Sequence, residues 1–283
     1  MFDYDQTLPL DVQVAATERG QGFATHDLSY ASPLGGRVPA FLVVPDGSGP
    51  FAGLLFLHPG QGSRATFRAE AESLAPSGVV CLTIDAPFLR PEYPRPDGPV
   101  KIRDAAAAEA AMCRQLIVDL RRGVDLLASR ADVAPERIGY VGHSLGATFA
   151  GPLVAEEPRL NAFVLMAGYP RYTDVPRYSP HAHFVKMRER LGPDGLEEYC
   201  AAMAPLDADR FVSQAGSAAP APLLFQWATR DEWISRGEAD RYYAIAREPK
   251  EQLWYEADHS FAEAPEAQRD RGRWLGEKLG FAR

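Results

Sequence analysis

A series of short, uninterrupted apolar runs, separated by longer segments with helical spacing, is the feature that most constrains the fold of this chain. Two runs that contain polar residues, 222–227 and 251–255, also read as strands, and the continuous apolar runs are residues 53–57, 79–84, 137–141 and 162–166. Strands buried on both faces of a sheet have this character, because neither face needs polar residues. The segments with helical spacing are residues 66–75, 103–129, 147–156 and 265–279. Strands that alternate with helices predict parallel strands joined by right-handed crossovers, and therefore an α/β fold.

An antiparallel hairpin is expected before the first of these runs. Residues 27–31 and 38–44 read as its two strands, and Gly35 and Gly36 lie between them. Glycine tolerates the positive φ angles that tight hairpin turns require. We therefore predict that the chain enters the sheet through a β-hairpin.

The strand–helix rhythm stops after residue 167 for about fifty residues. A break of this length inside a compact domain is usually functional, such as a lid over a site. We find no internal repeat and no low-complexity linker in the chain. The sequence therefore predicts one catalytic domain over residues 1–283, with a lid or cap inserted at residues 169–218.

Composition and charge argue against several classes of protein. Hydrophobic residues make up 46% of the 283 residues and charged residues 24%, which is enough apolar material for a large core. The net charge of -8 repels phosphate backbones and anionic headgroups, and no long run of Lys and Arg counters it. No apolar stretch reaches the ~18 residues of a membrane-spanning helix. We expect neither nucleic acid nor a membrane as a partner.

The N-terminus and the cysteines indicate the compartment. The first twenty residues are acidic where a signal peptide is basic, and they hold no apolar segment before a cleavage site. The three cysteines, Cys81, Cys113 and Cys200, are odd in number and show no CxxC spacing, so they read as reduced, buried thiols. We expect a cytoplasmic protein, and the sequence indicates no oligomeric state.

A G-x-S-x-G sequence follows directly on the apolar run 137–141. It reads Gly142-His143-Ser144-Leu145-Gly146, and a segment with helical spacing comes next. A nucleophile at such a strand-to-helix turn sits on sharply bent backbone, where flanking glycines relieve crowding and the hydroxyl projects outward. The pentapeptide alone arises by chance too often to decide the matter. Its position between a buried strand and a helix makes Ser144 our candidate nucleophile.

A serine hydroxyl needs a base within hydrogen-bond reach, and the base needs an orienting carboxylate. His259 comes just after the run 251–255, so it is the candidate base at the carboxyl end of a parallel strand. Asp231 follows the run 222–227 in the same way and is the candidate acid. Its neighbour Glu232 and the more distant Asp258 remain alternatives. Simpler readings are a helix cap for Asp231 and a loop histidine for His259.

The remaining histidines fit other roles. We expect His143 to point away from Ser144, and His58 to pack or hydrogen-bond beneath the site. His181 and His183 have a spacing that suits a metal, but no Cys or carboxylate lies at a familiar distance from them in sequence. They read as a solvated or pocket-lining pair, and we expect no metal.

The oxyanion of an acyl-transfer intermediate requires two N–H donors. Leu145 follows the nucleophile and supplies one. The loop after the run 53–57 is the source of the other, and because Pro59 has no N–H, the donor is Gly60 or Gln61. A plain Gly/Pro turn is the simpler interpretation of this loop.

Taken together, these residues resemble a known family. The segments 51–60, 137–147, 230–233 and 258–261 look like the dienelactone hydrolase and prolyl-oligopeptidase-like branch of the α/β-hydrolases. The resemblance implies a mostly parallel, eight-stranded sheet flanked by helices, no cofactor, and hydrolysis through an acyl-enzyme. Dienelactone hydrolases have a cysteine nucleophile, whereas this elbow has Ser144, which favours relatives of the esterase or peptidase kind.

Our hypothesis from the sequence is a serine hydrolase, of the carboxylesterase type, that acts on a small-molecule acyl substrate. Phe88, Tyr169, Tyr172 and Trp233 fall in loops after strands and are candidates to line the pocket, or equally to pack the lid. An amidase or aminopeptidase with the same triad is the nearest alternative. A non-catalytic binding protein of the same fold is the alternative from another class, and metal-dependent hydrolysis through His181 and His183 ranks behind both.

Overall fold

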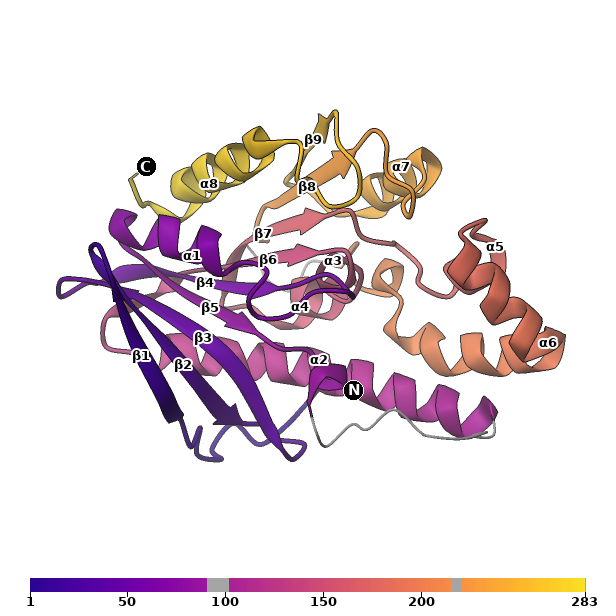
Figure 1. Ribbon diagram of the computed structural model, residues 1–283, viewed down its shortest axis with the longest axis horizontal. Helices are drawn as coiled ribbons and strands as arrows, with labels where there is room; N and C mark the ends of the chain where they lie inside the picture. The colour runs from indigo at the N-terminus through magenta and orange to yellow at the C-terminus, as the bar shows by residue number, and fades with distance from the viewer. Residues whose placement is uncertain (91–101, 215–219, 283) are drawn as a thin grey trace.

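The computed structural model describes residues 1–90, 102–214 and 220–282. The described part of the chain contains a nine-stranded sheet (Figure 1). Its strands are β1 Gln13–Gly20, β2 Phe23–Ala31, β3 Arg37–Pro45, β4 Phe51–Leu57, β5 Val79–Ile84, β6 Val133–His143, β7 Leu160–Met166, β8 Leu223–Ala228 and β9 Lys250–Tyr255. The four apolar runs lie in β4, β5, β6 and β7, and the runs 222–227 and 251–255 correspond to β8 and β9, with Pro222 just before β8.

The order of strands in the sheet is β1-β2-β3-β5-β4-β6-β7-β8-β9. The strands from β4 to β9 pair in parallel with one another, whereas β1, β2 and β3 form antiparallel pairs. The predicted hairpin is present as β2 and β3. The mostly parallel sheet is as predicted, but the expected count of eight was wrong by one strand. The additional strand, β1, is exposed at all eight of its residues and therefore has no apolar pattern to reveal it.

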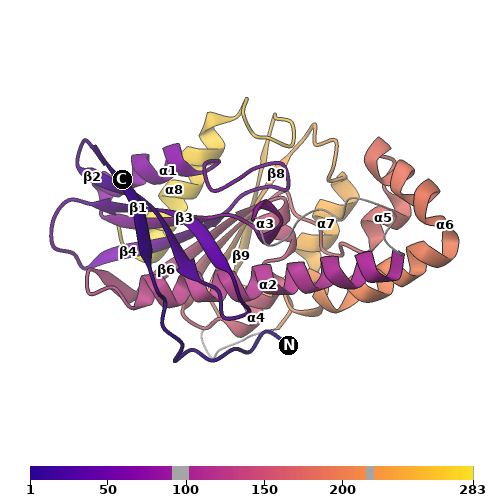
Figure 2. The ribbon, with the colours of Figure 1, turned by 60° about the horizontal axis from the view of Figure 1, so that its bottom comes forward.

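Helices cover both faces of the sheet. They are α1 Arg68–Leu74, α2 Ile102–Ala128, α3 Leu145–Thr148, α4 Gly151–Glu156, α5 Asp174–Tyr178, α6 Ala182–Met203, α7 Arg236–Ile245 and α8 Pro265–Leu279, with short 3₁₀ turns η1 Ala75–Ser77, η2 Pro87–Leu89, η3 Ala204–Leu206 and η4 Ala208–Arg210. Figures 1 and 2 show α1 and α8 together on one face and α2 on the other. A buried ion pair between Glu70 of α1 and Arg271 of α8 joins the two helices. The helix predicted at 147–156 is divided into α3 and α4.

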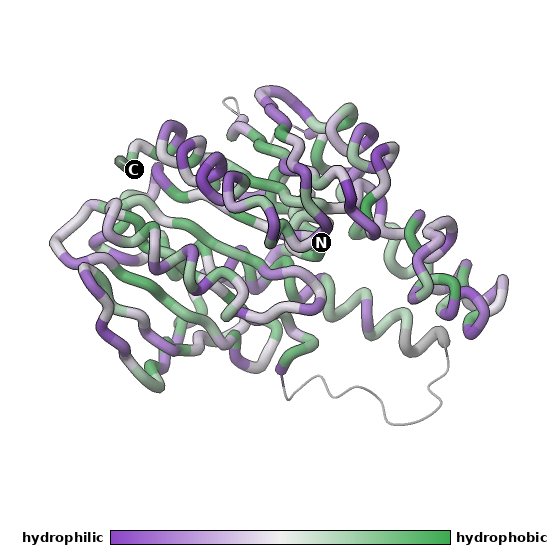
Figure 3. Tube along the Cα trace, turned by 45° about the horizontal axis from the view of Figure 1, so that its top comes forward, coloured by the Kyte–Doolittle hydropathy of each residue, from purple (hydrophilic) through white to green (hydrophobic). Residues whose placement is uncertain are grey.

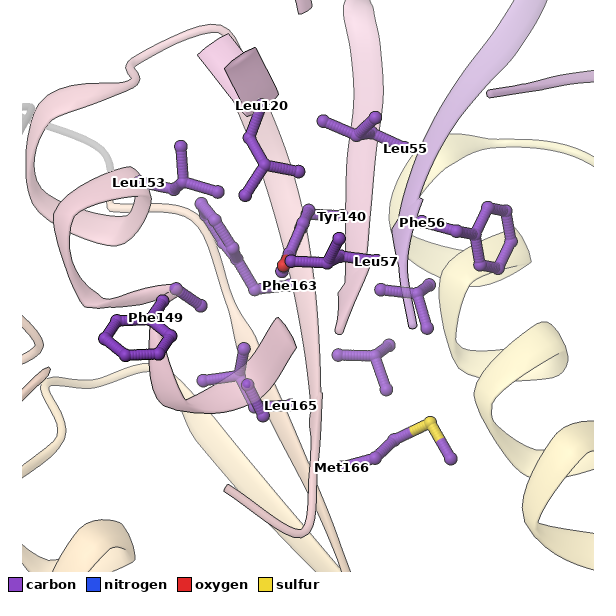
Figure 4. Close-up of a cluster of buried hydrophobic side chains, with 14 of the residues drawn as sticks. Leu55, Phe56, Leu57, Leu120, Tyr140, Phe149, Leu153, Phe163, Leu165 and Met166 are labelled. Atoms are coloured by element: carbon purple, nitrogen blue, oxygen red, sulfur yellow. The ribbon is translucent and has the colours of Figure 1, made fainter. Parts of the chain in front are cut away.

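The core lies between the central strands and these helices. Along β4, Leu55 and Leu57 point to the side of α2 while Phe56 points to the opposite side (Figure 4), and all three are fully buried. Figure 3 shows the same distribution, with hydrophobic residues concentrated along the central strands. Each such side chain contributes about 1.5–3 kcal/mol on burial. The sheet is thus a rigid support for the loops at its carboxyl edge.

The predicted insertion contains α5, α6, η3 and η4, so it is largely helical rather than irregular. Residues 215–218 of the predicted range lie outside the described residues. In Figure 1 the insertion lies beyond the carboxyl ends of β6 and β7, and α6 runs beside α2. Gly192, at φ 65°, and Pro193 interrupt α6. A left-handed glycine followed by proline hides the helical spacing, which is why the sequence did not indicate this helix.

The state of the cysteines and the character of the helices were both predicted from the sequence. The three cysteines are free thiols, and all are buried. Of the helices in the described ranges, none combines the length and the apolar character that crossing a bilayer requires.

Candidate active site

Three side chains from three strand ends meet at the carboxyl edge of the sheet. Ser144 follows β6, Asp231 follows β8 and His259 follows β9. The Oγ of Ser144 lies 2.8 Å from Nε2 of His259. The Nδ1 of His259 lies 2.9 Å and 2.8 Å from the two carboxylate oxygens of Asp231. The structure therefore joins the predicted nucleophile, base and acid in one chain of hydrogen bonds.

The backbone at Ser144 is strained. Its φ is 52° and its ψ is -102°, a conformation that L-residues rarely adopt. A Cβ added to Gly142 would lie 2.5 Å from the carbonyl carbon of Gly146, and one added to Gly146 would lie 2.6 Å from the carbonyl oxygen of Leu57. The turn stays closed because the N–H of Ser144 donates to the carbonyl of Met166 at 2.8 Å. Glycine is thus required on both sides of the serine.

Asp231 is fixed by the turn that follows it. Its Oδ1 accepts the N–H groups of Trp233 and Ile234, both at 2.8 Å, and its side chain is 2% exposed. Asp231 is not a helix cap, because Ser235 caps α7. A carboxylate that accepts backbone N–H groups keeps its charge in a buried setting. Asp231 can therefore hold the Nδ1–H of His259 throughout a reaction.

The alternative acids face other partners. The carboxylate of Asp258 accepts the N–H and the hydroxyl of Ser260, at 2.9 Å and 2.6 Å. Glu232 is exposed, and its Oε2 lies 3.5 Å from the backbone nitrogen of His259. Neither carboxylate has a hydrogen bond to the imidazole among the described residues. The geometry favours Asp231 as the orienting acid.

His143 and His58 support the site from below. The Nε2–H of His143 donates to the carbonyl of His259 at 2.8 Å, and burial, followed by the charge of His259, lowers the pKa of His143 to about 3. The Nδ1–H of His58 donates to the carbonyl of Pro59 at 2.7 Å, while its Nε2 accepts the N–H of Ala86 at 3.1 Å. Burial lowers the pKa of His58 as well. Both rings are held neutral, and His143 anchors the backbone of the base.

The sequence offers no signal for this role of His143. Its partner is a backbone carbonyl 116 positions away, which only the fold brings close.

The predicted oxyanion donors line the same cavity as Ser144. Leu145, Gly60 and Gln61 all border a cavity of about 230 Å³. Their backbone N–H groups donate to no acceptor among the described residues, whereas the next N–H in the loop, that of Gly62, donates to Pro59 at 2.8 Å. Free N–H groups beside a nucleophile are the arrangement that stabilises a tetrahedral oxyanion.

Aromatic side chains form the walls of this cavity. Three of the predicted pocket residues line it, namely Tyr169, Tyr172 and Trp233. The hydroxyl of Tyr169 donates to the carbonyl of Trp233 at 2.8 Å. Phe88 does not line it. Phe88 borders a second, smaller cavity instead, because it lies on η2 beside the N-terminal half of α2. His183, one of the two histidines expected to be solvated or to line a pocket, also borders the cavity, and the lining residues without a signal in the sequence are Thr148, Phe149 and Phe184.

The two insertion histidines belong to the aromatic wall rather than to a metal site. The ring of His181 stacks on that of Trp233 with centroids 3.7 Å apart, and its Nδ1 accepts the N–H of His183 at 3.2 Å. His183 borders the cavity itself. Within the described ranges, no group of three or more His, Cys, Asp or Glu side chains could hold a metal ion.

Comparison with known sequences gives a partial match. No family model matches the chain. The uncharacterized protein YfhR of Salmonella typhi is 26% identical over 156 residues, which are 51% of this chain and 47% of that protein. The chain thus spans about half the length of the curated relatives it matches.

Comparison with solved structures covers nearly the whole chain. An acetyl xylan esterase from a Paenibacillus species has a TM-score of 0.79 at 20% identity, with 96% of this chain and 90% of that one covered. Acetyl xylan esterase 1 from a Thermoanaerobacterium species has a TM-score of 0.75 at 14% identity, with 97% and 90% covered. At such identities the likeness concerns the architecture. This chain therefore has the α/β-hydrolase fold.

Proposed function

We propose that the protein is a serine hydrolase that cleaves the carboxylic ester bond of a small substrate through an acyl-enzyme. The hydrogen-bonded chain from Ser144 through His259 to Asp231, at the edge of an aromatic cavity, carries this proposal. Solved structures of the same fold that are named esterases support ester hydrolysis.

The tautomer of His259 follows from its two partners. Asp231 is ionised and accepts only, so Nδ1 of His259 carries the proton and Nε2 is free to accept. Nε2 then takes the proton of the Ser144 hydroxyl as Oγ attacks the acyl carbonyl. The imidazolium that forms is stabilised by the buried carboxylate 2.8 Å away.

Backbone N–H groups would stabilise the negative charge that develops on the carbonyl oxygen. The N–H of Leu145 and that of Gly60 or Gln61 lie along the cavity that holds Ser144. The intermediate collapses when Nε2 of His259 gives its proton to the leaving alcohol. Water, activated by the same nitrogen, then releases the acyl group from Ser144.

Residues 1–283 form, in this proposal, a single α/β-hydrolase domain with a lid at 169–218. His183 and Phe184 of α6 line the cavity from outside the sheet. A lid in this place excludes water from the acyl-enzyme and supplies part of the pocket wall.

The deciding experiment is Ser144→Ala. The variant should lose labelling by a fluorophosphonate probe, and its kcat for p-nitrophenyl acetate should fall about 10⁴-fold or more. Ser73→Ala is the matched control, because Ser73 lies on α1 and its hydroxyl donates to the carbonyl of Glu70. Unchanged turnover in Ser144→Ala would refute the mechanism.

Two further outcomes separate the alternatives. Preferred cleavage of aminoacyl p-nitroanilides would identify an amidase or aminopeptidase. A folded wild-type protein that neither labels nor turns over would be a binding protein.

A further inference from the structure

A second cavity adjoins the one at Ser144. It has a volume of about 110 Å³, and Leu145, Phe149 and Tyr172 line both cavities. Most of its other walls are apolar, including Phe88 and Met112. A single carboxyl group, that of Glu109 on α2, borders it among the described residues. Glu109 is partly exposed, so a ligand in this cavity would meet its carboxyl group beside the apolar walls.

Glu109 is only partly satisfied by the protein. Its Oε1 accepts the hydroxyl of Tyr199 on α6 at 2.7 Å, and the hydroxyl of Tyr172 lies 3.4 Å from that of Tyr199. No described residue donates to Oε2, although a carboxylate can accept about four hydrogen bonds. Burial raises the pKa of Glu109, while the charges of Arg190 and His183 act in the opposite direction. A cationic ligand would complete the set of donors and offset the desolvation.

The position of the second cavity relative to His259 indicates whether it receives the acyl group or the leaving group of the substrate. The leaving group receives its proton from His259. His259 borders a third cavity, of about 350 Å³, together with His143 and Trp233, and it borders neither of the other two. We infer that the leaving group lies toward the third cavity, which His259 borders. The acyl group then enters the first cavity, which Ser144 borders and which shares Leu145, Phe149 and Tyr172 with the second.

We propose that the acyl group of the substrate carries a protonated amine, which binds Glu109 in the second cavity. This inference rests on the hydrolase function proposed above. The acyl chain passes Leu145, packs on Phe149 and Tyr172, and ends with its ammonium group at Oε2 of Glu109. Acyl groups that end in a carboxylate are excluded, because they would meet Glu109 with like charge.

The test compares esters that differ only in the terminal group. The substrates are p-nitrophenyl 3-aminopropanoate against butanoate, and 6-aminohexanoate against heptanoate, so that an ammonium replaces a methyl group at equal length. These amino esters do not close to five- or six-membered lactams. The measured quantity is the ratio of kcat/KM for the ammonium ester to that for the methyl ester, after subtraction of the rate with Ser144→Ala.

We expect a wild-type ratio above one for at least one pair, and a fall of about tenfold or more in Glu109→Gln, as for a lost hydrogen bond to a charged group. Tyr199→Phe, which removes only the hydroxyl that orients the carboxyl, should lower the ratio less. Glu198→Gln is the matched control, because Glu198 is exposed and next to Tyr199 in sequence. This substitution removes the same charge as Glu109→Gln. It should leave the ratio unchanged.

A purely structural role of Glu109 would lower turnover of both esters and leave the ratio as it was. A wild-type ratio of one or less at both lengths overturns the inference, as does an equal ratio in wild type and Glu109→Gln. Failure of the inference is distinct from failure of the proposed function, which shows instead as hydrolysis of p-nitrophenyl acetate that survives Ser144→Ala.

Discussion

Acidification should destabilise the protein through His143, because this imidazole is buried in its neutral form against the backbone of His259. Its side chain is 5% exposed, and its Nε2–H donates to the His259 carbonyl at 2.8 Å. Burial lowers the pKa of His143 from 6.5 to about 3, and the charge of His259 adds to the effect. Protonation would place a buried cation next to His259, whose ring centroid is 5.2 Å away.

The sign and the size of the effect follow from linkage. Between pH 6.5 and about 3, the unfolded chain binds a proton at residue 143 and the folded chain does not, so stability falls as the pH falls. The contribution is fully present above pH 6.5. Each pH unit below that value removes about 1.4 kcal/mol, so at pH 4.5 we expect a loss of about 3 kcal/mol from this residue.

The assay is urea unfolding of the wild type and of His143→Gln at pH 7 and pH 4.5. Glutamine stays neutral and keeps an N–H donor for the His259 carbonyl. The variant is less stable than the wild type at pH 7, since packing is lost, and the gap should close by about 3 kcal/mol at pH 4.5. His26→Gln is the control, because His26 is only half-buried on β2 and should show a smaller change. An identical gap at both pH values would show that His143 is not held neutral.

Two other predictions concern the acid and the elbow. In Asp231→Asn the amide can donate to Nδ1 of His259, which favours the wrong tautomer, so kcat for p-nitrophenyl acetate should fall about 10⁴-fold with KM little changed; a loss confined to KM would contradict this role. Gly146→Ala should cost about 1–3 kcal/mol in thermal unfolding, because its Cβ would lie 2.6 Å from the carbonyl oxygen of Leu57. Gly237→Ala on α7, which has no atom within 4 Å, is the control and should not destabilise; equal melting shifts would count against the contact.

Most of the parallel strands could be predicted because a strand that is buried on both faces has an apolar sequence, although β9 is buried only at Tyr255. β4 and β5 are buried along nearly their whole length, so their apolar runs are unbroken. Residues that follow such strands converge on one edge of a parallel sheet. For this reason the sequence could place Ser144, Asp231 and His259 at neighbouring strand ends before any distance was known.

Other elements could not be predicted, because their structure depends on contacts with distant residues, and these contacts produce no pattern in the local sequence. β1 is held by its ladder with β2 and buries no face of its own. The two halves of α6 owe their position to packing against α2, and Gly192 and Pro193 obscure their period. From the sequence alone, Glu109 is an ordinary residue of a helix. Its contact with the hydroxyl of Tyr199 depends on the position of α6.

The proposed catalytic residues are each held by a hydrogen bond to a residue outside the insertion. The N–H of Ser144 bonds to Met166, the carbonyl of His259 accepts from His143, and Asp231 accepts the N–H groups of its own turn. The insertion contributes His183 and Phe184 to the cavity and Tyr199 to Glu109, whereas its described residues, 169–214, form no hydrogen bond with Ser144, Asp231 or His259. In the proposed function, the hydrogen bonds that fix the reaction geometry are therefore independent of the insertion, whereas the insertion contributes to substrate choice. Substitutions in α6 should change which ester is preferred while the reactivity of Ser144 toward a fluorophosphonate persists.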